Sequence, residues 1–166
     1  MSRELTKLCL HLTHPTRDLA SVCNGLDLVP LVIRKKGDAR KAPGGRLLGG
    51  KHASSFCSIP LGGRPRELLA KKIRSALLRL KPHKRALRML SAAGGGIVLF
   101  VGWFCDRHTG GSLDAGLLKE ASDLRIGIDL NIYVTDEPLR ASTHTRREAG
   151  RRRLFLGPVR VPCHFT

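Results

Sequence analysis

The hydrophobic and polar positions are most clearly patterned between residues 97 and 134. Residues 97–104 form an unbroken apolar run, which predicts a buried β-strand. Residues 114–124 repeat their leucines at helical spacing, and Ser112 or Asp114 can cap the resulting amphipathic helix. Residues 126–134 alternate strictly between apolar and polar positions, which indicates a second strand. This part of the chain therefore predicts strand, helix and strand in succession.

The first sixty residues predict shorter elements. Alternation over residues 7–12 is typical of a half-buried strand, and residues 16–23 favour a short helix. Residues 28–33 are apolar but contain a proline, so they form an edge strand or a strand that begins after that proline. Residues 34–51 are rich in glycine and basic side chains, which predicts a long exposed loop before a strand at 54–59.

Two amphipathic helices with basic outer faces are expected next. The first begins near Pro65 and continues to Leu80, and Pro82 kinks or ends it. The apolar stripe then continues to Ala93, and the three glycines at 94–96 stop the second helix.

The resulting order, β-α-β-β-α-α-β-α-β, predicts an α+β domain. Its helices cover one face of a mostly antiparallel sheet, as in ferredoxin-like arrangements. We assign this single domain to residues 1–137 and treat residues 138–166 as a basic C-terminal tail. The tail is either a disordered extension or an arm whose arginines contact phosphates.

Composition indicates the cellular compartment in which the protein is expected. The chain starts without an apolar leader, and its longest apolar run, residues 97–104, is too short to cross a bilayer. Its five cysteines contain no C-x-x-C pair, which favours free thiols in a reducing compartment. We therefore expect a cytoplasmic protein without membrane contact. No metal is expected, because the ligand types in Cys105, Asp106 and His108 crowd one turn with no second cluster nearby. No cofactor is expected, and the glycines at 94–96 precede a strand, whereas a phosphate-binding loop follows one.

The net charge of +17 is segregated along the chain. Residues 34–93 carry seventeen Lys and Arg against two acids, a net +15, whereas residues 94–139 carry three against seven, a net −4. The charges of residues 1–33 sum to zero, and residues 140–166 add a net charge of +6. Such asymmetry attracts polyanions or acidic partners through a field that salt screens.

Five segments of the chain carry a resemblance to a known family. They are RKKGD at 34–38, SSFCSI at 54–59, VLFVGWF at 98–104, GGSL at 110–113 and IDLNIY at 128–133. Over roughly residues 5–135 the chain resembles a bacterial family named domain of unknown function 4279. The resemblance implies a small bacterial cytoplasmic α+β domain and supplies no activity, cofactor or catalytic residue.

Side chains capable of catalysis are few. Cys105, Asp106 and His108 are close in sequence after the buried strand, and Asp129 and Tyr133 lie on the polar face of the last strand. None of them belongs to a recognised nucleophile signature. We expect a domain without enzymatic activity, and a small hydrolase that uses Cys105 and His108 is the third alternative.

The turn after the buried strand is the first candidate binding site. Trp103 precedes this turn, Asp106, Arg107 and His108 belong to it, and Tyr133 lies near the end of the last predicted strand. Turns that a rigid sheet holds in place often carry recognition. The alternative for Trp103 is a role in the core, where large aromatic side chains commonly pack.

The outer faces of the two basic helices form the second candidate surface. Its residues are Lys71, Lys72, Arg74, Arg79, Lys84, Arg85 and Arg88. Such a face either keeps a protein soluble or binds a polyanion. Aromatic residues are scarce and none is interleaved with this basic run, which argues against stacking of bases. We therefore predict a protein-interaction domain for an acidic protein partner. The alternative is a nucleic-acid-associated protein that binds phosphates through its basic helices and tail.

Overall fold

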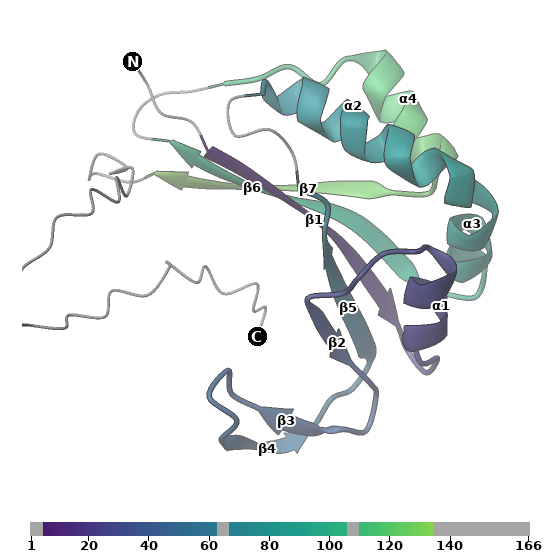
Figure 1. Cartoon of the computed structure of the whole chain (residues 1–166), viewed down its shortest axis with the longest axis vertical. Helices are drawn as coiled ribbons and strands as arrows, with labels where there is room; N and C mark the ends of the chain where they lie inside the picture. The colour runs from purple at the N-terminus through teal and green to yellow at the C-terminus, as the bar shows by residue number, and fades with distance from the viewer. Residues whose placement is uncertain (1–4, 63–66, 106–109, 135–166) are drawn as a thin grey trace, which may run out of the picture.

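The computed structural model describes residues 5–62, 67–105 and 110–134, and a five-stranded sheet forms its centre (Figure 1). The strand order is β2-β5-β1-β6-β7. The bounds of these strands are β1 Leu5–His14, β2 Val32–Arg34, β5 Ser55–Pro60, β6 Gly96–Cys105 and β7 Gly127–Val134. All neighbouring strands are antiparallel except β6 and β7, which are parallel.

The helices lie on one side of this sheet (Figure 1). Their bounds are α1 Ala20–Gly25, α2 Leu69–Leu80, the short 3-10 helix η1 Lys81–His83, α3 Lys84–Ala92 and α4 Ala115–Asp123. The expected α+β class, with helices on one face of a mostly antiparallel sheet, is confirmed. Among the described helices none is long and apolar enough to cross a membrane.

The core lies between the sheet and the helices. Leu10 of β1 pairs with Leu99 of β6, and both side chains are fully buried on the helix-bearing side. Ile73 and Leu77 of α2 and Leu117 of α4 belong to the same cluster. Alternation along each strand places every second side chain in this cluster, because successive residues point to opposite faces. The remaining side chains lie on the other face of the sheet.

The segment that we expected to be a long exposed loop contains a second sheet. Strands β3 Ala39–Lys41 and β4 Leu47–Lys51 pair as an antiparallel hairpin, so the prediction of a loop over 34–51 is wrong for this part. Every residue of both strands is exposed, and this hairpin has no buried face whose periodicity could reveal it. Gly45 has φ +84° at the tip, a conformation that glycine adopts without steric cost.

The ends of several elements follow from local chemistry. Pro82 lies in η1, which separates α2 from α3 as the predicted kink or stop requires. Asp114 accepts a hydrogen bond of 2.9 Å from the backbone N–H of Leu117 and so caps α4. Helix α1 begins at Ala20, four positions later than the Thr16 start that we expected. The segment 16–19 instead contains two backbone N–H groups, of Thr16 and Arg17, that donate to His14 Nδ1.

The specific ferredoxin-like order is not confirmed. The hairpin adds two strands between β2 and β5, and α4 connects the parallel pair β6 and β7. Strand β2 begins after Pro30 and lies at one edge of the sheet, which agrees with the predicted edge strand. Strand β7 forms the opposite edge.

Candidate functional site

The face of the sheet opposite the helices carries a set of aromatic and charged side chains. We call it the open face, because no helix among the described residues covers it (Figure 1). Strand alternation places the following residues on it: Lys7 and His11 of β1, Arg34 of β2, Phe56 and Ser58 of β5, Phe100, Gly102 and Phe104 of β6, and Asp129, Asn131 and Tyr133 of β7. Five rings, contributed by four neighbouring strands, are therefore present on one surface.

His11 connects the rings of three strands. Its ring centroid lies 5.2 Å from that of Phe56 in an edge-to-face arrangement and 5.0 Å from that of Phe100 in a stacked one. The guanidinium carbon of Arg34 lies 5.2 Å from the centroid of Phe56. A cation at this distance from a ring is attracted to the negative potential of the ring face. The guanidinium of Arg34 on β2 therefore borders this group of three rings.

Phe104 and Tyr133 form a second group. Their centroids lie 4.7 Å apart and their planes differ by 11°, so the two rings are stacked. The ammonium nitrogen of Lys7 lies 5.6 Å from the centroid of Phe104. Each ring group therefore has its own cation, one on β1 and one on β2.

Gly102 joins the two groups. A Cβ atom at this position would lie 3.4 Å from Phe104 and 3.6 Å from Phe100, with Tyr133 3.7 Å away. Gly102 is therefore adjacent to rings of both groups. We call the five rings of Phe56, His11, Phe100, Phe104 and Tyr133 the aromatic row.

The aromatic row is accessible at its ends and buried in its middle. Tyr133 is 37% exposed, and Phe56 and Phe104 are half-buried, whereas His11 and Phe100 are 7% and 8% exposed. Burial lowers the pKa of His11, and the negative charge of Asp129 opposes this shift. His11 Nε2 finds no hydrogen-bond partner among the described residues. The buried centre of the row therefore contains a neutral histidine. The accessible rings are Phe56 on one side and Phe104 and Tyr133 on the other.

A basic hairpin adjoins the β2 end of the aromatic row. Residues 34–51 carry seven Lys and Arg against the single acid Asp38. The base of the hairpin is held in place: the backbone N–H of Gly37 donates to His52, and that of Lys36 donates to Ser55 Oγ. Because Arg34 and Phe56 are partners in the register of β2 and β5, the hairpin starts beside the first ring. Exposed cations and accessible rings thus meet at this end of the sheet.

The two aromatic members of the predicted turn site lie on opposite faces of the sheet. Trp103 is 3% exposed and lies on the helix-bearing side of β6, which supports its alternative role in the core. Tyr133 lies on the open face, on the opposite side of the sheet. Asp106, Arg107 and His108 lie outside the described residues. Cys105 is buried, and its thiol donates to the carbonyl of Tyr133 over 3.8 Å.

The basic helical face is less uniform than the sequence predicted. Lys72 is 3% exposed, and its ammonium donates to the carbonyl and hydroxyl oxygens of Thr6 over 3.2 and 2.5 Å. Its placement on the outer face was therefore wrong, because it follows Leu69 by three residues and shares the buried stripe of α2. The aliphatic part of the Lys72 side chain packs at the edge of the core, and its ammonium reaches Thr6 of β1.

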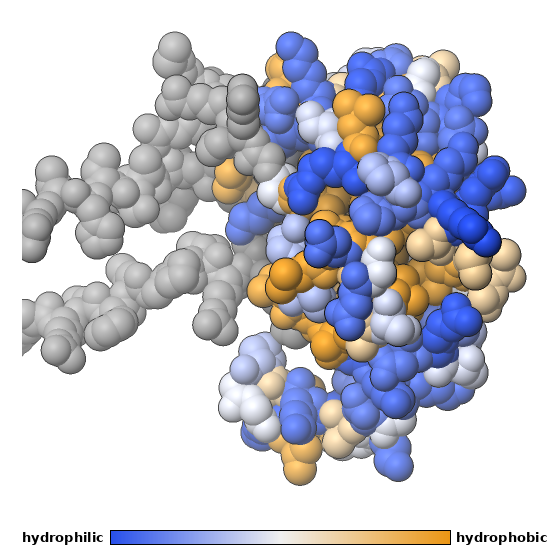
Figure 2. Space-filling view, turned by 45° about the vertical axis from the view of Figure 1, so that its right-hand side comes forward, coloured by the Kyte–Doolittle hydropathy of each residue, from blue (hydrophilic) through white to orange (hydrophobic). Residues whose placement is uncertain are grey.

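The other cations of this face differ in their partners. Arg74 pairs with Asp114 at 3.0 Å, and Arg79 donates to the carbonyl of Leu61. Lys84 and Arg88 lie near Asp123 and, after the hydrogen bond from Lys119, help to lower its pKa. Lys71 and Arg85 are exposed. Figure 2 views the helix-bearing side and shows hydrophobic side chains exposed between the hydrophilic ones.

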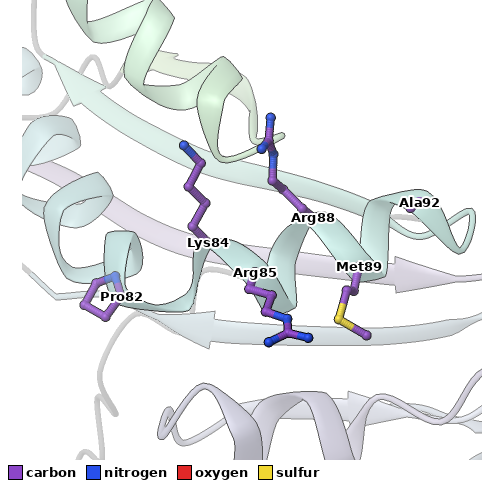
Figure 3. Close-up of a pocket in the computed structure, with 6 residues that line it drawn as sticks. All are labelled: Pro82, Lys84, Arg85, Arg88, Met89 and Ala92. Atoms are coloured by element: carbon purple, nitrogen blue, oxygen red, sulfur yellow. The ribbon is translucent and has the colours of Figure 1, made fainter.

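An open hollow on α3 is lined by several cations, but their side chains do not converge. Its lining residues are Pro82, Lys84, Arg85, Arg88, Met89 and Ala92. In Figure 3 the side chains of Lys84 and Arg88 extend to one side of α3, and those of Arg85 and Met89 extend to the other. A ligand in this hollow would therefore meet diverging cations, which makes it a weaker candidate than the open face.

The aromatic row was missed in the sequence because its members belong to four strands that only the strand order makes neighbours. A partial signal was present, since Phe100 and Phe104 occupy the alternate phase of a strand whose other phase enters the core. Across the described parts of the chain, no cluster of three or more His, Cys, Asp or Glu side chains could hold a metal ion.

Comparison with protein-family models, curated proteins and solved structures finds no match to the chain. The resemblance to domain of unknown function 4279 stays a prediction. The arguments about function below consequently depend on the geometry of the open face.

Proposed function

We propose that this protein binds single-stranded nucleic acid across the open face of its sheet. The observation that carries the proposal is the aromatic row, whose accessible rings, Phe56, Phe104 and Tyr133, are flanked by Arg34 and Lys7. Unpaired bases stack on such rings, whereas bases within a duplex are already stacked on one another.

The distribution of charge supports the same proposal. Phosphates that follow a stacked base need cations within a few ångströms of the ring, and Arg34 and Lys7 supply them. The hairpin of β3 and β4 extends this positive surface beyond β2. We expect tolerance of base sequence, because every base has a face that can stack.

The proposal differs from the nucleic-acid alternative that the sequence left open beside the predicted protein-interaction domain. That alternative placed the phosphates on the basic helices, which lie on the other side of the sheet. The scarcity of aromatic residues also loses its force as a counter-argument, because four of the seven Phe, Trp and Tyr residues belong to one face.

Binding to labelled oligonucleotides tests the proposal. Fluorescence anisotropy is measured for a single strand of about 12 nucleotides and for the matching duplex, at about 50 and about 200 mM salt. We expect preference for the single strand and affinity that falls as salt rises. Phe104→Ala and Tyr133→Ala should each weaken binding by roughly 5- to 150-fold, the range expected for one stacked base. Leu78→Ala, at an exposed position of α2, is the control.

A pair of charge variants assigns the binding face. Lys7→Ala with Arg34→Ala removes one lysine and one arginine from the open face, and Lys71→Ala with Arg85→Ala removes the same charges from the helices. We expect only the first variant to lower the slope of log affinity against log salt, by roughly 1.4. Equal binding of strand and duplex, or a larger loss from the helix-face variant, would refute the proposal.

The second candidate is the protein-interaction function, in which the helix-bearing side binds an acidic protein partner. Its supporting observation is the hollow on α3, where Met89 is 58% exposed beside Arg85. Methionine adapts its shape to apolar side chains of a partner, and the arginine would pair with acids around them. An acidic amphipathic peptide should then bind with an affinity that Arg85→Ala weakens and Tyr133→Ala leaves unchanged.

A further inference from the structure

Within residues 5–62, 67–105 and 110–134, no strand pairs with the outer edge of β7. Among the described residues, β7 pairs only with β6, so the backbone groups along its other side have no strand partner. Natural proteins protect such edges with lysine, proline, a bulge or a covering segment. The sequence of β7, GIDLNIYV, has no lysine or proline, and its single charge is Asp129. Eight residues of regular strand are therefore available for pairing.

An apolar strip follows this edge on the helix-bearing side. Leu130, Ile132 and Val134 point to this side and are 39%, 53% and 66% exposed. Leu118 of α4 is 47% exposed and lines the same hollow as Leu130. Helix α4 thus covers the beginning of β7 and leaves its second half without a covering layer. Exposed apolar side chains along an unpaired strand are characteristic of an association surface.

The charge distribution favours a second copy of this chain as the occupant. Two copies with a net charge of +17 each repel one another strongly wherever their basic surfaces meet. Residues 110–134, which contain α4 and β7, carry four acids against two basic residues. In a symmetric contact, where a surface meets the same surface of the second copy, this region therefore causes the least repulsion. The opposite edge, β2, has only three residues and adjoins the basic hairpin, which makes it unsuitable for self-association.

We propose that the protein forms a symmetric dimer in which β7 pairs antiparallel with β7 of a second copy. A two-fold axis at Asn131 gives a self-complementary register. Leu130 then faces Ile132 of the second copy, and Ile128 faces its Val134, so that apolar side chains meet on the helix-bearing side. On the open face, Asp129 faces Tyr133 of the second copy, whose hydroxyl can donate to the carboxylate.

This pairing produces one continuous sheet of ten strands from the two five-stranded sheets. Both helix layers lie on one side of it, and both open faces lie on the other. The stacked rings of Phe104 and Tyr133, next to the axis, become the centre of a surface twice as long. The dimer does not depend on the proposed function, because it is argued from the edge, the apolar strip and the charge.

The oligomeric state of the full chain tests the proposal. Nuclease-treated protein is examined by sedimentation velocity between about 1 and about 100 µM, and we expect a monomer–dimer equilibrium within this range. Ile132→Lys should raise the dissociation constant at least about tenfold, because the new ammonium would lose water in the interface. Leu78→Lys, at a position 51% exposed compared with 53% for Ile132, is the matched control and should dimerise as the wild type does.

Folding and register are checked separately. Circular dichroism must show that Ile132→Lys keeps its secondary structure. In a Cys163→Ser background, Asn131→Cys should form a disulfide-linked dimer under mild oxidation, because the two residues face each other at the axis. Ser122→Cys, exposed on α4, should remain monomeric under the same conditions. A wild type that stays monomeric, an unchanged Ile132→Lys dimer, or cross-linking at 122 and not at 131 would overturn the proposal.

Discussion

Replacing His11 with phenylalanine isolates the effect of one buried titratable group on the stability of the sheet. His11 lies between Phe56 and Phe100, with 7% of its surface exposed. Phenylalanine keeps a ring in the stack and removes both nitrogens. Losing the unpartnered Nε2 removes an unfavourable burial of about 1–3 kcal/mol. The larger ring introduces crowding of about the same size, so we expect a small net change near neutral pH.

The pH dependence gives the decisive comparison, because crowding does not change with pH. Burial lowers the pKa of folded His11 from its ordinary value of 6.5, although Asp129 opposes the shift. As the pH falls below 6.5, the unfolded chain binds the proton first, and the folded protein loses stability. One proton limits this loss to about 1.4 kcal/mol per pH unit, or at most about 2 kcal/mol between pH 6.5 and about 5.

The assay is urea denaturation at about pH 7.5 and about pH 5, at constant ionic strength. Fluorescence of Trp103, the sole tryptophan and a core residue, reports unfolding. We expect the wild type to lose more stability at the lower pH than His11→Phe does. Asp129→Asn should enlarge the loss, since it removes the charge that favours protonated His11. An identical pH dependence for wild type and His11→Phe would refute the reasoning.

Three further predictions concern the core, the open face and the thiols. Leu99→Ala, at a fully buried position in β6, should lower the free energy of unfolding by about 3–5 kcal/mol in the same assay, and a change below about 1 kcal/mol would contradict the central position of this strand. Gly102→Ala should raise it by about 0.5–1 kcal/mol, since the added Cβ makes ordinary contacts of 3.4 Å or more and strand glycines are intrinsically unfavourable; a loss of stability would show that the rings need the vacant space. Burial, together with Cys23 2.8 Å away, raises the pKa of Cys57. In a Cys163→Ser variant we therefore expect Ellman's reagent to detect no thiol in the folded protein and four after denaturation, and fast labelling of the native state would contradict the buried placement.

Most elements of the fold could be predicted from periodicity. Strand β6, helix α4 and strand β7 were expected because a buried strand, an amphipathic helix and a half-buried strand leave distinct patterns over 97–134. The helix cap at Asp114 and the helix break at Pro82 could also be predicted, because each depends on residues that are close in sequence. The hairpin of β3 and β4 left no such pattern, because every residue of both strands is exposed and neither face is buried.

The candidate site was beyond prediction for a different reason. His11, Phe56 and Phe100 are contributed by strands β1, β5 and β6, and only the order β5-β1-β6 makes them neighbours. Alternation over 7–12 and 126–134 indicated which side chains of these strands face away from the core, but the sequence did not indicate which strands are adjacent. Trp103 and Tyr133 were placed in one site with the turn that follows Trp103, because each lies near the end of a predicted strand. In the register of β6 and β7, the side chains of Trp103 and Tyr133 point to opposite faces of the sheet.

The sequence by itself determined the class of the fold, the alternation of the strands at 7–12 and 126–134, and the separation of basic from acidic segments. These properties depend on the periodicity and composition of single segments, which are local. Tertiary structure decided the neighbours of each strand, the burial of the Lys72 ammonium beside Thr6, and the collection of five rings on one face. Strand order depends on how all the apolar surfaces pack at once, so contacts between distant segments arise only when the whole core forms.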